Sequence, residues 1–415
     1  MKPLGEEVPV IAHERKRIVL FPAFVLALFL FVSVSASAGA AAAGQRSLPG
    51  LTVAVAADLH YIAPELTDGG SYFTRLIENA DGKSMMYCEE ITDAFLEQLA
   101  RQKPDVLILA GDLTFNGARA SHEALVGKLH SLEEAGVPVL VIPGNHDLYS
   151  TMSASFRGDG FTRVENLDAD GFAALYGAFG YDGALARDRS SLSYTCEPVP
   201  GLRILMLDVN TAAAPGSLTE NTFLWVREQL EEATRDGAQV LAVSHQNLLE
   251  HNMLFIDGFL LGGNSRLREL YEEFGVLCNL SGHMHIQHIG VSPGGVPEIL
   301  TSALSVSPHQ YGLLELGGDG MDYHTESVVF PHSVESAQFF WNNSYQKAEG
   351  SLSAPSDRLC RFIADINAAY FAGRTDRLAW DDTLYEEIWS QDILYGLYLQ
   401  TVRDDGFQDQ TRAHF

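Results

Sequence analysis

The sequence predicts an α/β domain in which helices flank two packed β-sheets, followed by a helical C-terminal region. From Leu51 to Leu280, short apolar runs typical of strands alternate with segments of helical periodicity. Strand-like runs without helices follow, and beyond Pro331 the apolar and aromatic residues recur at helical spacing. These changes in pattern place the α/β domain at residues 46–330 and the helical region at residues 331–415.

The first part of the domain alternates strands with helices. The predicted strands span residues 51–57, 106–110, 137–142, 202–207, 240–243 and 276–280. They are apolar at successive positions, as strands covered on both faces must be. The predicted helices span residues 89–102, 121–135, 220–234 and 266–274. Gly136 directly follows the second helix, where glycine is a common C-cap.

The later part of the chain changes character twice. Further strands are predicted at residues 287–291, 298–304, 312–316 and 326–330. The C-terminal region reads as two helices, 357–372 and 382–401, each with an apolar stripe. Because a two-helix region is small to fold alone, we expect it to pack on the sheets.

Two long connections interrupt the α/β part. Residues 61–88 and 148–173 each begin directly after a polar motif. Connections of this length in a compact domain are usually functional lids or walls, or else disordered. We expect both to form the rim of a site.

The composition is that of an acidic globular protein. Of 415 residues, 46% are hydrophobic and 20% are charged, and 27 basic against 54 acidic residues give a net charge of −27. Such a body repels a polyphosphate backbone, so we expect no duplex nucleic acid as a partner. Small phosphate substrates remain compatible, because bound metal ions would dominate the local field.

The N-terminal residues 1–45 have the order of an export signal. A basic cluster at 15–17 precedes an apolar run at 18–34 and a small-residue stretch at 35–39. An uncleaved membrane anchor is the alternative, although the run is slightly short for a span and contains Pro22. In both cases we expect the body to work outside the cytoplasm, either extracellular, in the cell envelope or anchored facing outward.

The cysteines are few and scattered. They are Cys88, Cys196, Cys278 and Cys360, and none forms a C-x-x-C pair. Export would permit a disulfide, but the sequence does not rank the possible pairings. Cys278 lies in a strand-like run and is expected to be a buried free thiol.

Polar motifs follow the predicted strands at five places. They are Asp58-Leu59-His60, Gly111-Asp112, Gly144-Asn145-His146-Asp147, His245 and Gly282-His283-Met284-His285. Carboxylate, imidazole and amide groups without a thiolate suit two closely spaced divalent cations. Gly111-Asp112 alone would more often be a turn than a ligand, so the ordered set of five is what indicates a metal site.

The motifs suggest how the ligands would divide. Asp112, if shared, would hold two cations about 3.5–4 Å apart, a spacing suited to displacement at phosphorus. The other ligands would be Asp58, His60 and one later histidine for one metal, and Asn145, His245 and the other later histidine for the second. His146 adjoins a ligand, so we expect its side chain to point elsewhere and to be a candidate proton donor.

The five ordered motifs resemble those of the calcineurin-like metallophosphoesterases, over about residues 50–310. The segments 61–66, 88–95 and 303–312 are similar to exported bacterial relatives of the class III cyclic-nucleotide phosphodiesterases, which also carry a helical C-terminal region. Met284 departs from the small polar residue that many members carry, which affects the shape of the pocket rather than ligation.

The resemblance implies a four-layer α/β/β/α sandwich with two divalent metal ions (Mn, Fe or Zn) at its strand ends. The implied ligands are Asp58, His60, Asp112 and His285 for one metal, and Asp112, Asn145, His245 and His283 for the other. A hydroxide between the metals would attack phosphorus, and His146, oriented by a nearby acidic group such as Asp112, would protonate the leaving alkoxide. Asn145 could also donate to a phosphate oxygen in the transition state.

We therefore expect a metal-dependent phosphodiesterase that acts on a small phosphodiester, with cyclic nucleotides as the first candidates. A phosphomonoesterase or nucleotidase with the same metals is the alternative, since the motifs do not show whether a second ester substituent fits. A non-catalytic binding protein on this fold is a minor alternative, because no motif residue is lost. His251 and His309 are candidates for gripping substrate at the rim, and a surface or core role is their other interpretation.

Overall fold

The computed structural model of the chain describes Leu48 and residues 50–318 and 320–415. The expected export signal or membrane anchor lies outside these residues and stays a prediction. Among the described residues, no helix combines the length and the apolar character that crossing a membrane requires.

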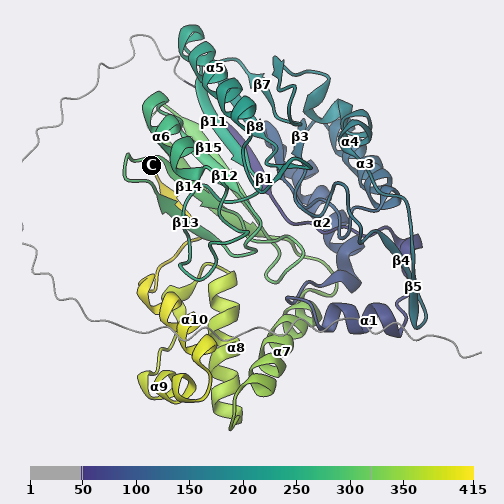
Figure 1. Cartoon of the computed structure of the whole chain (residues 1–415), viewed down its shortest axis with the longest axis vertical. Coiled ribbons are helices and arrows are strands. Elements are labelled where there is room, and N and C mark those ends of the chain that lie inside the picture. Colours follow the sequence, from purple (N-terminus) through teal and green to yellow (C-terminus); the bar gives the residue numbers. More distant parts are fainter. Residues whose placement is uncertain (1–47, 49, 319) are drawn as a thin grey trace, which may run out of the picture. The chain divides into compact units, whose positions relative to one another are not determined.

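Two large β-sheets form the centre of the described part of the chain (Figure 1). The first has the strand order β17 (Arg412–His414), β16 (Gly320–Ser327), β15 (Gln310–Gly317), β1 (Leu51–Ala56), β2 (Val106–Ala110) and β3 (Val139–Ile142). The second has the order β13 (His288–Val291), β14 (Pro297–Leu300), β12 (Cys278–Ser281), β11 (Gln239–Ser244), β8 (Leu202–Leu207), β7 (Tyr194–Val199) and β6 (Ala186–Arg187). β1, β2 and β3 run parallel, as do β8, β11, β12 and β14.

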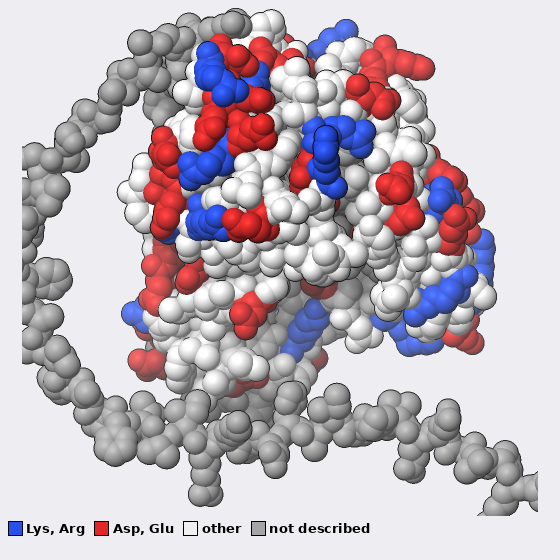
Figure 2. Space-filling view, turned by 45° about the horizontal axis from the view of Figure 1, so that its top comes forward, with Lys and Arg blue, Asp and Glu red and all other residues white. Residues whose placement is uncertain are grey.

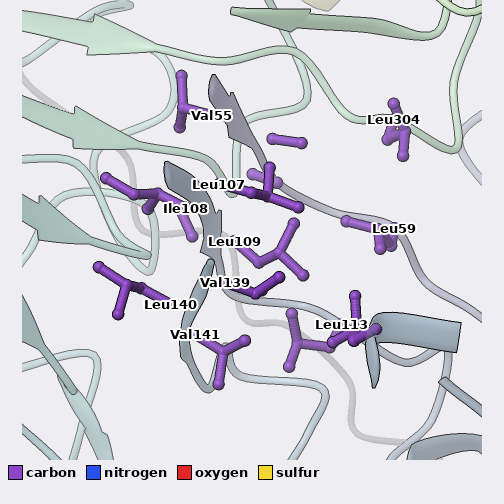
Figure 3. Close-up of a cluster of buried hydrophobic side chains, with 14 of the residues drawn as sticks. Val55, Leu59, Leu107, Ile108, Leu109, Leu113, Val139, Leu140, Val141 and Leu304 are labelled. Carbon is purple, nitrogen blue, oxygen red and sulfur yellow. The ribbon is translucent and has the colours of Figure 1, made fainter. Parts of the chain in front are cut away.

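The apolar strands form the core between the layers. Figure 3 shows side chains of β1, β2 and β3 in one cluster, together with Leu59 and Leu113, which follow the ends of β1 and β2. Leu109 in β2 is fully buried, and Leu59 is 2% exposed. The burial continues past the strand ends, so the segments that leave these strands are held in place by the core.

Helices cover the outer faces of both sheets (Figure 1). α2 (Cys88–Gln102) and α3 (Arg119–Glu134) pack on the first sheet, and α5 (Glu220–Asp236) and α6 (Asn264–Phe274) pack on the second. In β8, Ile204 and Met206 join the core shared with the first sheet, whereas Leu205 and Leu207 pack with α5 and α6. This alternation confirms the expected order of helices, sheet, sheet and helices.

The C-terminal region is richer in structure than expected. It contains α7 (Ser333–Ser351), α8 (Asp357–Phe371), α9 (Asp382–Gln391) and α10 (Ile393–Asp404). The helix expected at 382–401 is divided at Asp392, because the Asp392 carboxylate accepts hydrogen bonds from the amides of Leu394 (2.8 Å) and Tyr395 (3.1 Å) and caps α10. The final strand β17 then pairs with β16, so the chain end returns to the first sheet.

One predicted strand is misplaced. Residues 326–330 were expected to be a strand because they form an apolar run, but β16 ends at Ser327. β16 instead takes its register from β15, with Met321 and Tyr323 buried between exposed residues.

The two long connections are ordered and bonded to each other. The first contains α1 (Ser71–Glu78), and the second contains the hairpin of β4 (Ala154–Arg157) and β5 (Gly160–Arg163), which lies beside α1 in Figure 1. The amide of Tyr72 donates to the carbonyl of Gly158 (3.0 Å), and that of Asp68 donates to the carbonyl of Phe156 (3.2 Å). The two segments therefore form one wall rather than two independent loops.

All four cysteines fall within the described residues, where they are buried and free. Burial raises the pKa of Cys88 and of Cys196 to about 12, which keeps both thiols protonated at neutral pH. Because the thiolate is the reactive form, these side chains act as small apolar groups.

Basic and acidic side chains are mixed on the face seen in Figure 2. The described Lys and Arg residues stand there in small groups between Asp and Glu, and no continuous basic area crosses this face.

Candidate metal centre

Eight polar side chains gather where strands of both sheets end. Asp58 and His60 follow β1, Asp112 follows β2, Asn145 and His146 follow β3, His245 follows β11, and His283 and His285 follow β12. Because β1 to β3 run parallel, and β11 and β12 run parallel, the side chains leave each sheet at the carboxyl ends of its strands.

The backbone at these positions is strained. Five of the eight residues adopt the left-handed conformation, with φ of 55° at Asp58, 45° at His60, 49° at Asp112, 72° at His283 and 63° at His285. Residues other than glycine adopt such angles at a cost, and sites that need a fixed side-chain direction retain them.

Two motif glycines make room for the carboxylates. A Cβ atom at Gly282 would lie 2.6 Å from Oδ2 of Asp58, and one at Gly144 would collide with the Asp112 carboxylate. At both positions, glycine is the residue that allows the close approach of a carboxylate.

One cluster consists of Asp58, His60 and His285, whose potential ligand atoms lie within 4.8 Å of one another. The Nε2 atoms of the two histidines are 3.3 Å apart, and Nε2 of His285 is 3.4 Å from Oδ1 of Asp58. That Asp58 oxygen is buried and has no hydrogen-bond partner among the described residues. A buried carboxylate oxygen without a donor fits a cation.

A second cluster consists of Asp112, His245 and His283, again within 4.8 Å. Asn145 extends it, with Oδ1 3.1 Å from Nε2 of His245. Asp112 directs one oxygen to each cluster, since Oδ1 is 3.4 Å from Nε2 of His245 and Oδ2 is 3.7 Å from Nε2 of His60. The structure therefore brings together all seven ligand candidates, with Asp112 between the two sets.

Hydrogen bonds orient the rings. Nδ1 of His245 bonds the carbonyl of Ala110 (2.8 Å), which directs Nε2 into its cluster. His283 is turned the other way, with Nε2 bonded to the carbonyl of Gly258 (2.9 Å) and Nδ1 left for ligation. Such outer bonds select the nitrogen that is free to bind a metal.

Asp81 is a site residue that the sequence did not reveal. Its Oδ2 lies 2.9 Å from Nδ1 of His285, and its Oδ1 lies 2.8 Å from Nζ of Lys83. A carboxylate behind a metal-binding histidine fixes the ring and raises its basicity. Asp81 stands in the first long connection, outside every motif, so no local pattern indicated this role.

Burial and neighbouring charges shift the pKa values of the cluster residues. Burial opposes ionisation of Asp112, but His245 and His146 outweigh it and hold the pKa of this carboxyl well below its usual range. Burial would lower the pKa of His245, yet the charge of Asp112 raises it to about 9. Burial and Lys83 would lower the pKa of His285, yet Asp81 and Asp58 raise it to about 9. Burial lowers the pKa of His283 to about 4.

His146 lies beside the clusters with an accessible ring, and it has a potential ligand atom within 4.8 Å of those of His60 and Asp112. Its side chain is 40% exposed, whereas His60 and His245 are fully buried. Nδ1 bonds the carbonyl of Phe115 (2.9 Å), and Nε2 lies 3.9 Å from Oδ2 of Asp112. The carbonyl of Phe115 therefore holds the ring through Nδ1, and Asp112 faces the other nitrogen at the longer distance.

Asp147 connects the loops that carry Asp112 and Asn145. Its buried carboxylate accepts hydrogen bonds from the amides of Gly144 (2.8 Å), Leu113 (3.0 Å) and Thr114 (2.9 Å). Asp147 belongs to the third motif, but only the structure shows that it fixes the segments after β2 and β3 relative to each other.

The two histidines expected at the rim lie in the interior. His251 is 8% exposed and bonds Nδ1 of His288 (2.8 Å) and the carboxylate of Glu298 (3.1 Å). His309 is 2% exposed and bonds the carbonyl of Leu304 (2.8 Å) and the hydroxyl of Ser336 (2.7 Å). The expected rim position is therefore wrong for both, because neighbouring polar groups occupy both nitrogens of each ring.

Two cavities border the candidate ligands. One, of about 320 Å³, lies between His283 and His285 on one side and tyrosines of α8 and α10 on the other. The second, of about 330 Å³, is lined by Asn145 and His146 and by residues of the wall formed by α1 and the β4–β5 hairpin. The clusters thus have room for substituents in two directions.

The profile of the calcineurin-like phosphoesterase family matches residues 51–287, which is more than half of the chain. The chain belongs to this family. The matched segment contains every residue of the two clusters. The family depends on a dinuclear metal centre, and these clusters are its candidate ligands here.

The chain is also similar to individual proteins. The chain is 27% identical over 242 residues to a probable glycerophosphodiester phosphodiesterase, GpdQ, of Arcobacter nitrofigilis, covering 57% of this chain and 73% of that protein. It is 39% identical over 59 residues to a probable cyclic nucleotide phosphodiesterase of Vesicomyosocius okutanii, covering 14% of this chain and 24% of that protein. A dimetal phosphatase from Danio rerio has a similar fold, with a TM-score of 0.50 and 17% identity over 68% of this chain and 98% of that chain.

Removal of the Asp81 carboxylate is expected to weaken metal binding. In Asp81→Ala, His285 loses the group that bonds Nδ1, so metal affinity should fall roughly 10- to 100-fold. Competition with a chelator measures the affinity, and Glu231→Ala, which removes an exposed carboxylate from α5, is the matched control. Unchanged affinity in Asp81→Ala would show that His285 does not depend on this bond.

Metal loading at pH 7 is expected to release protons. With pKa values of about 9, His245 and His285 are protonated in the metal-free protein, whereas ligation requires neutral rings. About two protons should therefore leave, and apparent affinity should fall as the pH drops below 9. Calorimetric titration in two buffers of different ionisation enthalpy measures the release, and identical heats in both would contradict it.

Proposed function

We propose that this protein is a metal-dependent phosphodiesterase that hydrolyses a small phosphodiester, with cyclic nucleotides as the first candidates. The observation that carries the proposal is the pair of cavities beside the clusters, one at His283 and His285 and the other at Asn145 and His146. An acyclic phosphodiester has two separate organic substituents, and each cavity can take one. In a cyclic nucleotide both ester oxygens belong to one nucleoside, which would enter one of the two cavities. A monoester would leave one cavity without a substituent.

The names of the relatives support a phosphodiester as the substrate class, but they differ in the substrate. The GpdQ-like relative is named for glycerophosphodiesters, and the other is named for cyclic nucleotides. A phosphomonoesterase or nucleotidase with the same ligands is the alternative that the experiment below distinguishes.

The ligand set fits two divalent ions, and we propose Mn, Fe or Zn in these positions. When bound, the ions supply Lewis acidity and activate water for attack on phosphorus. The chain itself supplies the proton for the leaving group. The carbonyl of Phe115 holds Nδ1 of His146, so Nε2 is the nitrogen that can donate to the leaving oxygen. The Asn145 amide can donate to a phosphate oxygen while its Oδ1 faces the ligand cluster.

We further propose that the enzyme works outside the cytoplasm. This rests on the basic, apolar and small-residue order of residues 1–45. The partner would be a small phosphoester rather than duplex nucleic acid, in keeping with the net charge of −27.

The preference for a diester is tested with the protein loaded with Mn, Fe or Zn. We expect kcat/KM for a bis-aryl phosphate to exceed that for the matching mono-aryl phosphate by at least about tenfold, because only the diester fills both cavities. Cyclic nucleotides are then compared with each other. No hydrolysis with any of the metals would contradict the enzyme, and faster turnover of the monoester would favour the alternative.

The role of His146 is tested by His146→Ala. Loss of a general acid should lower kcat for alkyl leaving groups roughly 10²- to 10⁴-fold and affect nitrophenyl esters much less, since an acidic leaving group needs no proton. Metal content is measured in parallel and should not change. His130→Ala, which removes an exposed histidine of α3, is the matched control. Full activity of His146→Ala on alkyl esters would exclude the assignment.

A further inference from the structure

Four aromatic side chains line one cavity together with a methionine and an arginine, and most of them come from the wall formed by α1 and the β4–β5 hairpin. We call this group the aromatic pocket, and its members are Tyr72, Phe115, Met152, Phe156, Phe161 and Arg163. They line the same cavity of about 330 Å³ as Asn145 and His146.

The rings of the aromatic pocket are in mutual contact. Tyr72 stacks on Phe156 with ring centroids 6.0 Å apart, and its centroid lies 5.3 Å from that of Phe161. Phe156 is also 6.3 Å from Phe115, the residue whose carbonyl orients His146. The pocket therefore begins at the candidate proton donor and continues along one aromatic surface.

The outer part of the pocket is open to solvent. Phe156 is 5% exposed, but Phe161 is 45% and Met152 is 63% exposed. Large apolar side chains that remain accessible beside a reactive group have surface available for a ligand.

A positive charge limits what can bind. The guanidinium carbon of Arg163 lies 4.9 Å from the centroid of Phe161. Among residues 50–318 and 320–415, no carboxylate forms an ion pair with Arg163. Aromatic cages commonly bind quaternary ammonium groups, but Arg163 would repel such a cation. A planar aromatic group that is neutral or anionic can stack on the same surfaces without this repulsion.

We propose that the aromatic pocket holds the leaving group of the substrate, and that this group is planar and aromatic, as in an aryl or nucleoside ester. The inference rests on the proposed function, because His146 can protonate only an oxygen on its own side of the site. In an acyclic diester, the substituent that remains on phosphorus would then lie in the other cavity, next to His283 and His285.

Two phosphonates, whose P–C bond to the ring substituent cannot be hydrolysed, measure the preference directly by calorimetric binding to the metal-loaded protein. Methyl benzylphosphonate carries a planar ring in place of the leaving group, and methyl cyclohexylmethylphosphonate carries a puckered ring with the same number of carbons. We expect the benzyl compound to bind roughly tenfold more tightly. Equal affinity of the two compounds would overturn the inference.

Phe161→Ala should remove most of this difference. Thr162→Ala is the matched control, since Thr162 lies in the same strand, points to the opposite face and does not line the cavity. The unfolding midpoints of both variants are measured in parallel, and that of Phe161→Ala should fall only slightly because the Phe161 side chain is 45% exposed. A similar effect of both substitutions would overturn the role of Phe161.

The kinetic comparison separates this inference from the proposed function. Methyl phenyl phosphate and methyl hexafluoroisopropyl phosphate have leaving groups of similar acidity, and kcat/KM should favour the phenyl ester through KM. Hydrolysis of both esters with equal phosphonate affinities would retain the phosphodiesterase and reject the aromatic pocket. Preferential binding of the benzyl compound without hydrolysis of any ester would retain the pocket as a binding site and reject the phosphodiesterase.

Discussion

The buried carboxylate of Asp112 is the constraint on which the site depends. A buried anion is stable only when positive charge and donors surround it, and here the backbone amide of His146 donates to Oδ1 at 2.8 Å. His245 and His60 approach its two oxygens from different clusters. The same arrangement explains the glycine at position 144, where a side chain would displace the carboxylate. Removal of Asp112 would take away the carboxylate that faces both clusters.

The strands determine where the Asp112 carboxylate lies, and the segments around the site determine the shape of the two cavities beside it. Parallel strands in each sheet deliver the ligands at their carboxyl ends, and Asp147 ties two of the outgoing segments together. Around them, the C-terminal helices border one cavity and the wall of α1 and the β4–β5 hairpin borders the other. The candidate metal centre would thus provide the chemistry, and the segments that line the two cavities would select the substituents of the substrate.

Much of the fold and the metal centre could be read from the sequence because both depend on local patterns. β2 and β8 have the predicted bounds, since continuous apolar runs between polar residues mark buried strands. The prediction of strands was wrong where contacts between residues distant in the sequence decide the structure. β17 is only three residues long and exists through its pairing with β16, and the misplaced strand at 326–330 follows the register of β15. The sequence does not show that both ring nitrogens of His251 and of His309 are hydrogen-bonded in the interior, so it left a position at the rim open for both.

The sequence by itself determined which residues could bind metals, because ligand chemistry belongs to the side chain and the motifs follow strands that any such sheet would align. It also singled out the two connections that border the site. Only the tertiary structure decided that Asp81 supports His285, that the carbonyl of Phe115 holds Nδ1 of His146, and that aromatic residues of α1 and the hairpin share one pocket. These relations join segments far apart in the chain. They depend on side-chain directions and packing, which no local pattern of residues records.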